Sequence, residues 1–148
     1  DESLWKETLA KAEYKDRIKS SIIATDWNGD AINAAQANAK TAGVSHMISF
    51  DKVSFEKTFV PSGPGIVMLN PEYGERLGEE DMLRSVYKDI GDFFKQSCGG
   101  KMGYIFTGNS NLAKSIGLRT KSRTEFMNAR IECRLLEYEL YAGSRREK

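Results

Sequence analysis

Apolar residues along this chain fall into short uninterrupted runs separated by longer amphipathic stretches, a pattern typical of strands alternating with helices. The run Ile66–Leu69 follows a loop rich in proline and glycine, so it predicts a strand buried on both faces. Three further runs predict strands: 21–25, which closes on Asp26, then 47–50 and 102–106.

In the segments between these runs, apolar residues recur at the spacing of an amphipathic helix. Asn28 can cap the second helix and Gly43 can end it. The expected helices span residues 4–12, 30–42, 79–97 and 109 or 110 to 116. The expected inner faces are Ile32, Ala35, Ala39 and Ala42 in the second helix, and Met82, Val86, Ile90, Phe93 and Phe94 in the third.

The C-terminal part of the chain has a different period. Residues 119–141 alternate on both sides of Asn128-Ala129, which predicts an antiparallel hairpin. The preceding elements predict an α/β sheet with right-handed connections and helices on both faces. No linker divides the sequence, so we expect residues 1–148 to belong to one domain.

Composition narrows the class of protein. The 148 residues are 40% hydrophobic and 29% charged with a net charge of +1, which indicates a soluble globular protein whose nucleic-acid surface, if present, is a local patch. Cys98, Cys133 and the one histidine, His46, lack the spacing of a zinc site. With neither a signal peptide nor a membrane-spanning run, we expect a cytoplasmic protein without a bound metal.

Ligands of open α/β sheets bind beyond the carboxyl ends of the strands, which selects Asp26 as a first candidate. Its carboxylate could accept hydrogen bonds from both hydroxyls of a ribose while the Trp27 ring covers an adenine. Asp26 could equally cap the following helix while Trp27 fills a gap in the packing. The pattern leaves both readings open.

Asn70-Pro71-Glu72-Tyr73 is the second candidate, directly after the strand at 66–69. The Asn70 side-chain oxygen and one backbone carbonyl could accept both N–H groups of an exocyclic amine and direct its lone pair toward a methyl donor. Tyr73 offers a face on which an extruded base could stack. The alternative is a turn with a packed aromatic ring.

The wider sequence around this motif resembles the rRNA guanosine-N2 methyltransferases, which often carry an RNA-binding THUMP domain. Their motif is Asn-Pro-Pro-Tyr-Gly-Glu-Arg-Leu-Gly, and residues 70–78 differ from it only at Glu72. The agreement continues through nearly the whole chain, in residues 91–95, 104–109, 118–119 and 132–138.

The resemblance implies a Rossmann-like class I methyltransferase fold and S-adenosylmethionine as cofactor. It implies that Asp26 and Trp27 contact the cofactor's ribose and adenine, that Asn70 and Pro71 hold the N2 amine of a guanosine in 23S-type ribosomal RNA, and that Tyr73 stacks on the base. Arg76 could contact a phosphate or pair with a neighbouring glutamate. Other basic side chains that could form an RNA-binding patch are Lys114, Arg119, Lys121, Arg123, Arg130 and Arg134.

Three departures from the family pattern qualify this interpretation. Glu72 stands where the motif has its second proline, and Ser54 stands where the family commonly has an acid that contacts the adenine, with Asp51 nearby but out of register. The third departure is upstream of Asp26, where the family's glycine-rich cofactor loop is not found.

The chain therefore matches the C-terminal two-thirds of a catalytic domain, without its first strand. In the family that strand lies between those ending at Asp26 and Asn70, so we expect two unpaired strand edges. The missing N-terminal part of the protein or a symmetry mate is the expected partner at this gap. The alternatives to guanosine methylation are a non-catalytic RNA-binding module that retains the fold, and an adenine-N6 methyltransferase.

Overall fold

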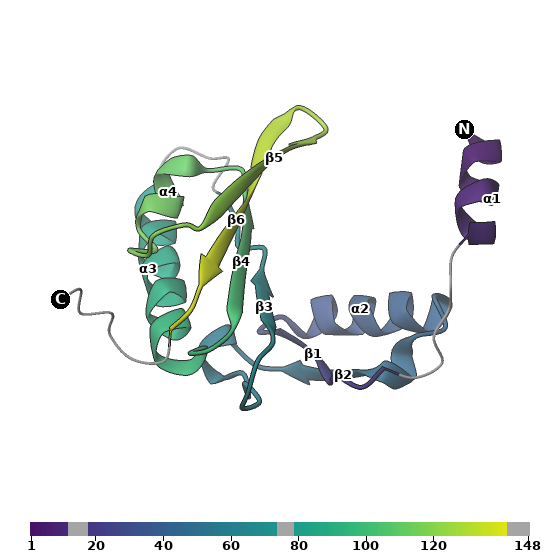
Figure 1. Cartoon of the computed structure of the whole chain (residues 1–148), viewed down its shortest axis with the longest axis horizontal. Helices are drawn as coiled ribbons and strands as arrows, with labels where there is room; N and C mark the ends of the chain where they lie inside the picture. Colours follow the sequence, from purple (N-terminus) through teal and green to yellow (C-terminus); the bar gives the residue numbers. More distant parts are fainter. Residues whose placement is uncertain (12–17, 74–78, 142–148) are drawn as a thin grey trace. The chain divides into compact units, whose positions relative to one another are not determined.

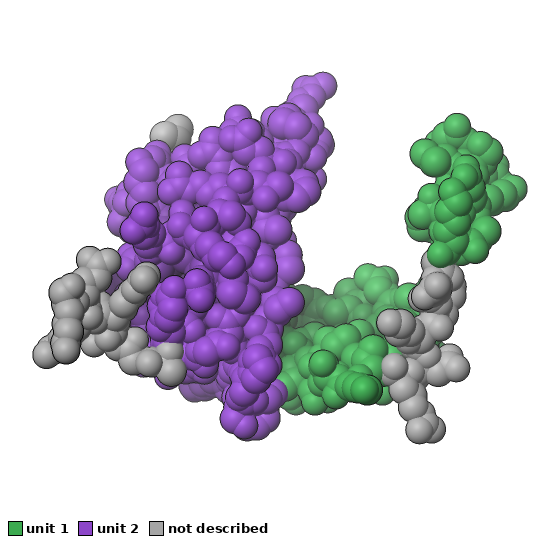
Figure 2. Space-filling view, viewed as in Figure 1, with its two compact units in different colours: residues 1–54 green, residues 55–148 purple. Residues whose placement is uncertain are grey.

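The structure is a computed structural model that describes residues 1–11, 18–73 and 79–141 (Figure 1). The chain divides into two compact units, residues 1–54 and residues 55–148 (Figure 2). The order of helices and strands predicted from the sequence is confirmed throughout these described ranges.

Unit 1, residues 1–54, contains a two-stranded parallel sheet. Its elements are α1 (Glu2–Lys11), β1 (Ile22–Asp26), α2 (Gly29–Thr41), a 3-10 turn at Ser45–Met47 and β2 (Ile48–Lys52). The register pairs Ile22 with Ile48 and Asp26 with Lys52, so both strands end at the same edge of the sheet. Because parallel strands need a crossover, α2 connects them.

The boundaries of α2 follow from local chemistry. The Asn28 side chain accepts the backbone N–H of Asp30 at 2.9 Å, and Gly43 adopts a φ of 74° just beyond the helix, a conformation that suits glycine. Ile32 and Ala39 are buried as predicted. The prediction was wrong for Ala42, which is the exposed C-cap residue, because the helix has ended before its side chain can face the sheet.

Unit 2, residues 55–148, contains a four-stranded mixed sheet in the order β3-β4-β6-β5. Its elements are a 3-10 turn at Phe55–Lys57, β3 (Ile66–Leu69), α3 (Glu79–Ser97), β4 (Met102–Thr107), α4 (Ser110–Lys114), β5 (Ser122–Asn128) and β6 (Ile131–Glu139). β3 and β4 are parallel, whereas β6 is antiparallel to both β4 and β5. The predicted C-terminal hairpin is therefore confirmed, as is a mixed α/β fold.

The core of unit 2 lies between this sheet and α3 with α4, which cover one of its faces (Figure 1). Tyr87, Ile90 and Phe94 form the buried line of α3 and pack with Ile105 of β4. The prediction that Met82 belongs to this line was wrong, because Met82 is 76% exposed. A helix turns about 100° per residue, so a line through Tyr87 passes through residue 83 and leaves position 82 on the next face.

The prediction that β3 is buried on both faces was also wrong. Val67 and Leu69 pack against the core, but Ile66 and Met68 are 71% and 62% exposed. Alternate side chains of a strand point to opposite faces, and within the described part of unit 2 both helices lie on the Val67 side. An apolar run therefore does not by itself establish two-sided burial.

Candidate functional site

The Asn70 motif and the end of β4 meet at one edge of the unit 2 sheet. β3 and β4 are parallel and pair Leu69 with Ile105, so Asn70 and the residues after Thr107 leave the sheet on the same side. Gly108 makes close approach possible there: a Cβ on this residue would lie 3.1 Å from the Tyr73 ring. The motif therefore packs directly on the backbone that follows β4.

Within the motif, the Tyr73 hydroxyl donates a hydrogen bond to Asn70 Oδ1 at 3.1 Å. Asn70 is exposed, whereas Pro71 and Tyr73 are partly buried. No donor among the described residues bonds to the backbone carbonyl of Pro71. The segment thus presents two oxygen acceptors in neighbouring residues, the Pro71 carbonyl and the Asn70 amide oxygen, whose second lone pair is not used by the Tyr73 hydroxyl.

Two backbone carbonyls of the motif are held by side chains from elsewhere in the chain. The Tyr87 hydroxyl donates to the carbonyl of Glu72 at 3.2 Å, and Asn109 Nδ2 donates to the carbonyl of Tyr73 at 3.1 Å. Thr107 Oγ1 lies 2.7 Å from the Tyr87 hydroxyl and accepts the backbone N–H of Asn109 at 3.1 Å. Because Tyr87 has one proton and gives it to Glu72, the Thr107 hydroxyl must donate to Tyr87.

Burial keeps this chain of hydrogen bonds intact. The side chain of Tyr87 is fully buried and Thr107 is 2% exposed. Desolvation raises the pKa of the Tyr87 hydroxyl, although the hydrogen bond from Thr107 acts in the opposite direction. Tyr87 therefore remains a protonated donor through the neutral pH range.

Tyr138 of β6 is a useful contrast because it is buried equally deeply, at 1% exposure. Burial raises its pKa to about 12. No described residue forms a hydrogen bond with its hydroxyl. Unit 2 thus contains two buried tyrosines that differ mainly in whether their hydroxyl groups are bonded.

In unit 1, the candidate cofactor residues also gather at the carboxyl edge of the sheet. Asp26 is the last residue of β1, and its Oδ1 accepts the backbone N–H of Asn28 at 2.7 Å. No described donor reaches the second carboxylate oxygen. Trp27 follows with 73% of its side chain exposed, and Ser54 lies two residues beyond the end of β2 at the same edge.

Among the candidate RNA contacts, Arg119 and Lys121 lie in the part of the chain that the structure describes. Arg76 lies outside the described residues. Arg119 is exposed, but Lys121 forms an ion pair with Glu137 at 3.1 Å, and its backbone N–H bonds to the same residue. Glu137 pairs with Tyr104 of β4, and Tyr104 pairs with Met68 of β3, so Lys121 lies at the level of the sheet two residues before Asn70.

A basic residue closer to that edge is Arg130, in the turn of the β5–β6 hairpin. Thr107 pairs with Arg134, so the strand continues past the edge toward the turn. A Cβ on Gly108 would lie 2.9 Å from Ile131, which places this end of the hairpin beside the motif. Arg130 is exposed there.

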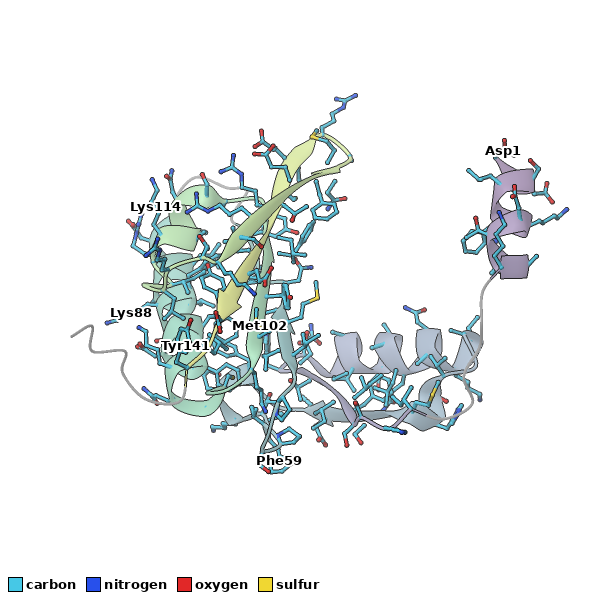
Figure 3. All side chains as sticks on the ribbon, in the orientation of Figure 1. Asp1, Phe59, Lys88, Met102, Lys114 and Tyr141 are labelled. Atoms are coloured by element: carbon cyan, nitrogen blue, oxygen red, sulfur yellow. The ribbon has the colours of Figure 1, made fainter. Side chains whose placement is uncertain are left out.

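The opposite end of the unit 2 sheet has a concave surface of about 270 Å³. Its lining includes Lys101 together with Met102 and Tyr141, both labelled in Figure 3. Lys101 donates hydrogen bonds to the carbonyls of Pro61 and Gly63, both at 2.6 Å, so its ammonium group is already used to hold a loop. We assign no ligand to this surface.

The described residues contain neither a group of metal-ligating side chains nor a membrane-spanning helix. Within them, no three His, Cys, Asp or Glu side chains could hold a metal ion. The helices of the described ranges are too short or too polar to cross a membrane. Cys98 and Cys133 are buried free thiols, and burial raises the pKa of Cys98 to about 11.

Sequence reasoning did not identify Tyr87, Thr107 and Asn109 as parts of the site. One signal was present for two of them, because residues 107–109 follow a predicted parallel strand and belong to a segment that matches the family. Tyr87 gave no such signal, since its spacing in α3 is that of an ordinary core residue. The contact to Glu72 spans 15 positions of sequence and requires the folded structure.

The chain is similar to known methyltransferases in sequence. The family model for the RMKL-like methyltransferase domain matches residues 2–137. A Synechocystis sp. protein whose name describes an RNA methyltransferase is 37% identical over 143 residues, which cover 95% of this chain and 37% of that protein. The ribosomal RNA large subunit methyltransferase K/L of Syntrophotalea carbinolica is 38% identical over 123 residues, which cover 80% of this chain and 17% of the relative.

Solved structures share the fold. A structure from Clostridium difficile 630, described as a possible methylase, has a TM-score of 0.79 at 23% identity and covers 99% of this chain and 39% of that one. A predicted N6-adenine-specific DNA methylase from Listeria monocytogenes has a TM-score of 0.67 at 26% identity, covering 79% of this chain and 30% of that one. The chain spans well under half the length of each of these four proteins.

Proposed function

Since the chain belongs to the RMKL-like methyltransferase domain family, we propose that it forms the base-binding part of an S-adenosylmethionine-dependent RNA methyltransferase. The observation that carries this proposal is the pair of acceptors directly after β3, the Asn70 side-chain oxygen and the Pro71 carbonyl.

The acceptors suit an exocyclic amine. Such an amine has two N–H groups, and two oxygens in neighbouring residues can accept both and leave the nitrogen lone pair directed away from the protein backbone. Asn70 Oδ1 has two lone pairs, so it can accept an N–H of the amine beside the Tyr73 hydroxyl or in its place. Positioning of this kind needs no metal and no strong base, because the proton can leave to solvent or to a nearby carbonyl after the nitrogen has reacted.

The residues at the end of β1 fit the adenosine part of the cofactor. The second oxygen of Asp26 has no described donor, and a ribose hydroxyl can supply one. Trp27 is exposed beside it and can cover an adenine ring. Ser54, two residues after the end of β2, is the proposed contact to the adenine itself. S-adenosylmethionine, when bound, supplies a methyl group on a positively charged sulfur that a nitrogen lone pair can attack.

For the methionine part of the cofactor we propose that a further segment is required. Residues 1–28 contain no glycine, so they cannot form the glycine-rich loop that the family uses. Among the described strands, β1 pairs only with β2 and β3 only with β4, which leaves one edge of each strand for a partner. The partner would be another part of the same protein or a second copy of the chain.

Calorimetric titration of the 148-residue chain with S-adenosylhomocysteine tests this requirement. We expect no binding in the micromolar range, and micromolar affinity would contradict the need for a further segment. Extending the chain upstream by a strand and a glycine-rich loop should then restore binding.

The proposed target is the N2 amine of a guanosine in large-subunit ribosomal RNA. Support comes from the nine-residue match at 70–78 and from the name of the Syntrophotalea relative. An adenine N6 amine would satisfy the same two acceptors, and the Listeria structure carries that activity in its name. Mass spectrometry of nucleosides from RNA incubated with the full-length protein would distinguish methylguanosine from methyladenosine.

A second candidate is an RNA-binding module without catalysis, favoured by the exposed Glu72 carboxylate in the motif. Asn70→Ala in the full-length protein separates the two functions. We expect turnover to be abolished while the affinity for S-adenosylhomocysteine stays unchanged. Methyl transfer at the unchanged rate would contradict the role of Asn70, and RNA binding without transfer by the unmodified protein would support the second candidate.

A further inference from the structure

We propose that Tyr87 and Asn109 are positioning residues for the methyl-accepting amine. They would act by fixing the carbonyls of Glu72 and Tyr73 and thereby the direction of the two acceptors that precede them. This inference rests on the proposed function, because it concerns the same amine. The new element is a role for side chains that lie outside residues 70–73.

The motif is tied by hydrogen-bonded side chains to three separate elements. Tyr87 belongs to α3, Thr107 ends β4, and Asn109 caps α4. Asn109 uses both ends of its amide: Oδ1 accepts the backbone N–H of Asn111 and of Leu112, each at 3.0 Å, while Nδ2 holds the carbonyl of Tyr73. The motif therefore cannot shift without disturbing the start of α4.

Position 72 carries a glutamate where the family motif has its second proline. A proline there would fix its own φ near −65° and limit the conformations of its neighbour, whereas Glu72 has no such restriction. In this chain the carbonyl of Glu72 is instead held by a fully buried hydroxyl, and the carbonyl of Tyr73 by a side-chain amide. The N–H of Glu72 forms no hydrogen bond among the described residues, so proline is compatible with the same bonding pattern.

The structure therefore indicates that hydrogen bonds replace the stiffness of the second proline. Acceptors must hold a reacting amine to within a fraction of an ångström, and a misplacement of about 1 Å can reduce a rate by about 100-fold. Loss of either hydrogen bond should thus lower kcat while leaving the proposed cofactor residue Asp26, which belongs to unit 1, unaffected.

Tyr87→Phe in the full-length protein is the direct test, with Tyr138→Phe as the matched control. Both changes remove one hydroxyl from a fully buried ring, but only that of Tyr87 is bonded to the motif. We expect kcat for Tyr87→Phe to fall by about tenfold or more, with the Kd for S-adenosylhomocysteine unchanged. For Tyr138→Phe, kcat should stay within about twofold of the unmodified protein.

Two further variants separate positioning from core packing. Asn109→Asp keeps a good helix cap but replaces the donor, so it should lower kcat in the same way. Adding Glu72→Pro to Tyr87→Phe should recover most of the lost kcat, because proline restores the stiffness by another route. A purely structural role for Tyr87 predicts no such recovery.

The bonding itself can be measured without methyl transfer. In the 148-residue chain, the carbonyl ¹³C resonance of Glu72 should shift in Tyr87→Phe and stay in place in Tyr138→Phe. An unshifted resonance in Tyr87→Phe would overturn the inference. Unchanged kcat in both Tyr87→Phe and Asn109→Asp would also overturn it, and so would a loss of kcat in Tyr138→Phe as large as that in Tyr87→Phe. If the unmodified protein transfers no methyl group, the proposed function fails. The Glu72 carbonyl resonance still decides whether the hydrogen bond from Tyr87 exists.

Discussion

The two buried tyrosines of unit 2 should respond to the same chemical change with opposite signs of stability. Tyr138→Phe removes a hydroxyl that is buried without a described partner, and burying such a group costs about 1–3 kcal/mol. After allowance for the small void left behind, we expect the variant to gain roughly 1 kcal/mol. Tyr87→Phe removes the donor to Glu72 and the acceptor of Thr107, each worth about 1 kcal/mol, so it should lose about 2 kcal/mol.

The assay must report on unit 2 alone, because a chain with two units need not unfold in one step. Both tryptophans, Trp5 and Trp27, lie in unit 1, so their fluorescence would miss the change. Cys98 and Cys133 are both fully buried in unit 2, and their labelling by a thiol reagent in increasing urea follows its unfolding. With a slope of about 2 kcal/mol per molar urea, a gain of about 1 kcal/mol raises the midpoint by about 0.5 M.

A lower urea midpoint for Tyr138→Phe would refute the reasoning, since it would mean that the hydroxyl contributes a favourable contact. A higher midpoint for Tyr87→Phe would equally contradict the hydrogen bonds assigned to that residue. Equal slopes in all three proteins are the control that the unfolding reaction itself is unchanged.

Three other changes test separate parts of the chain. Gly91→Ala should cost about 3 kcal/mol or more by thiol labelling, because its Cβ would lie 1.9 Å from the backbone oxygen of Ile116; a near-neutral result would contradict this packing. Lys101→Met should speed amide exchange in the loop at 61–65, whose carbonyls lose their donor, and unchanged exchange would count against that link. Hydrogen bonding, first from Ser122, lowers the pKa of the Glu137 carboxyl group. The stabilisation that Glu137 gives the fold is therefore present above the ordinary carboxyl pKa of 4.5 and lost as pH falls through the lowered value. Glu137→Gln should be less stable than the unmodified protein at neutral pH, with a difference in stability that closes in acid, and a difference independent of pH would exclude this cause.

The helices and strands were predictable because their signals are local. Asn28 caps α2 through its own backbone neighbourhood, and the bounds of α3 follow from its apolar period and the glycines after Cys98. Exposure was less predictable. Period alone cannot say whether a second layer covers Ile66 and Met68, nor whether the line of a helix runs through residue 82 or residue 83.

The same distinction holds for the site. Asn70, Pro71 and Tyr73 could be proposed as a candidate site because a predicted strand, two acceptors and an aromatic ring follow one another within a few residues. The hydrogen bonds from Tyr87 and Asn109 to this segment could not be predicted. Asn109 reaches Tyr73 across 36 positions, and Tyr87 looks like any other core residue until its hydroxyl is located. Contacts between side chains distant in sequence depend on the register of β3 with β4, which no local pattern specifies.

The one-sided pairing of β3 has a consequence for handling the protein. Its outer edge carries backbone groups without a partner strand among the described residues, next to the exposed side chains of Ile66 and Met68. Edges of this kind promote strand addition between molecules and hence aggregation. The further segment proposed above would, by pairing with β3, cover this edge, so the concentration at which a preparation stays monodisperse becomes a simple measure of whether that segment is present.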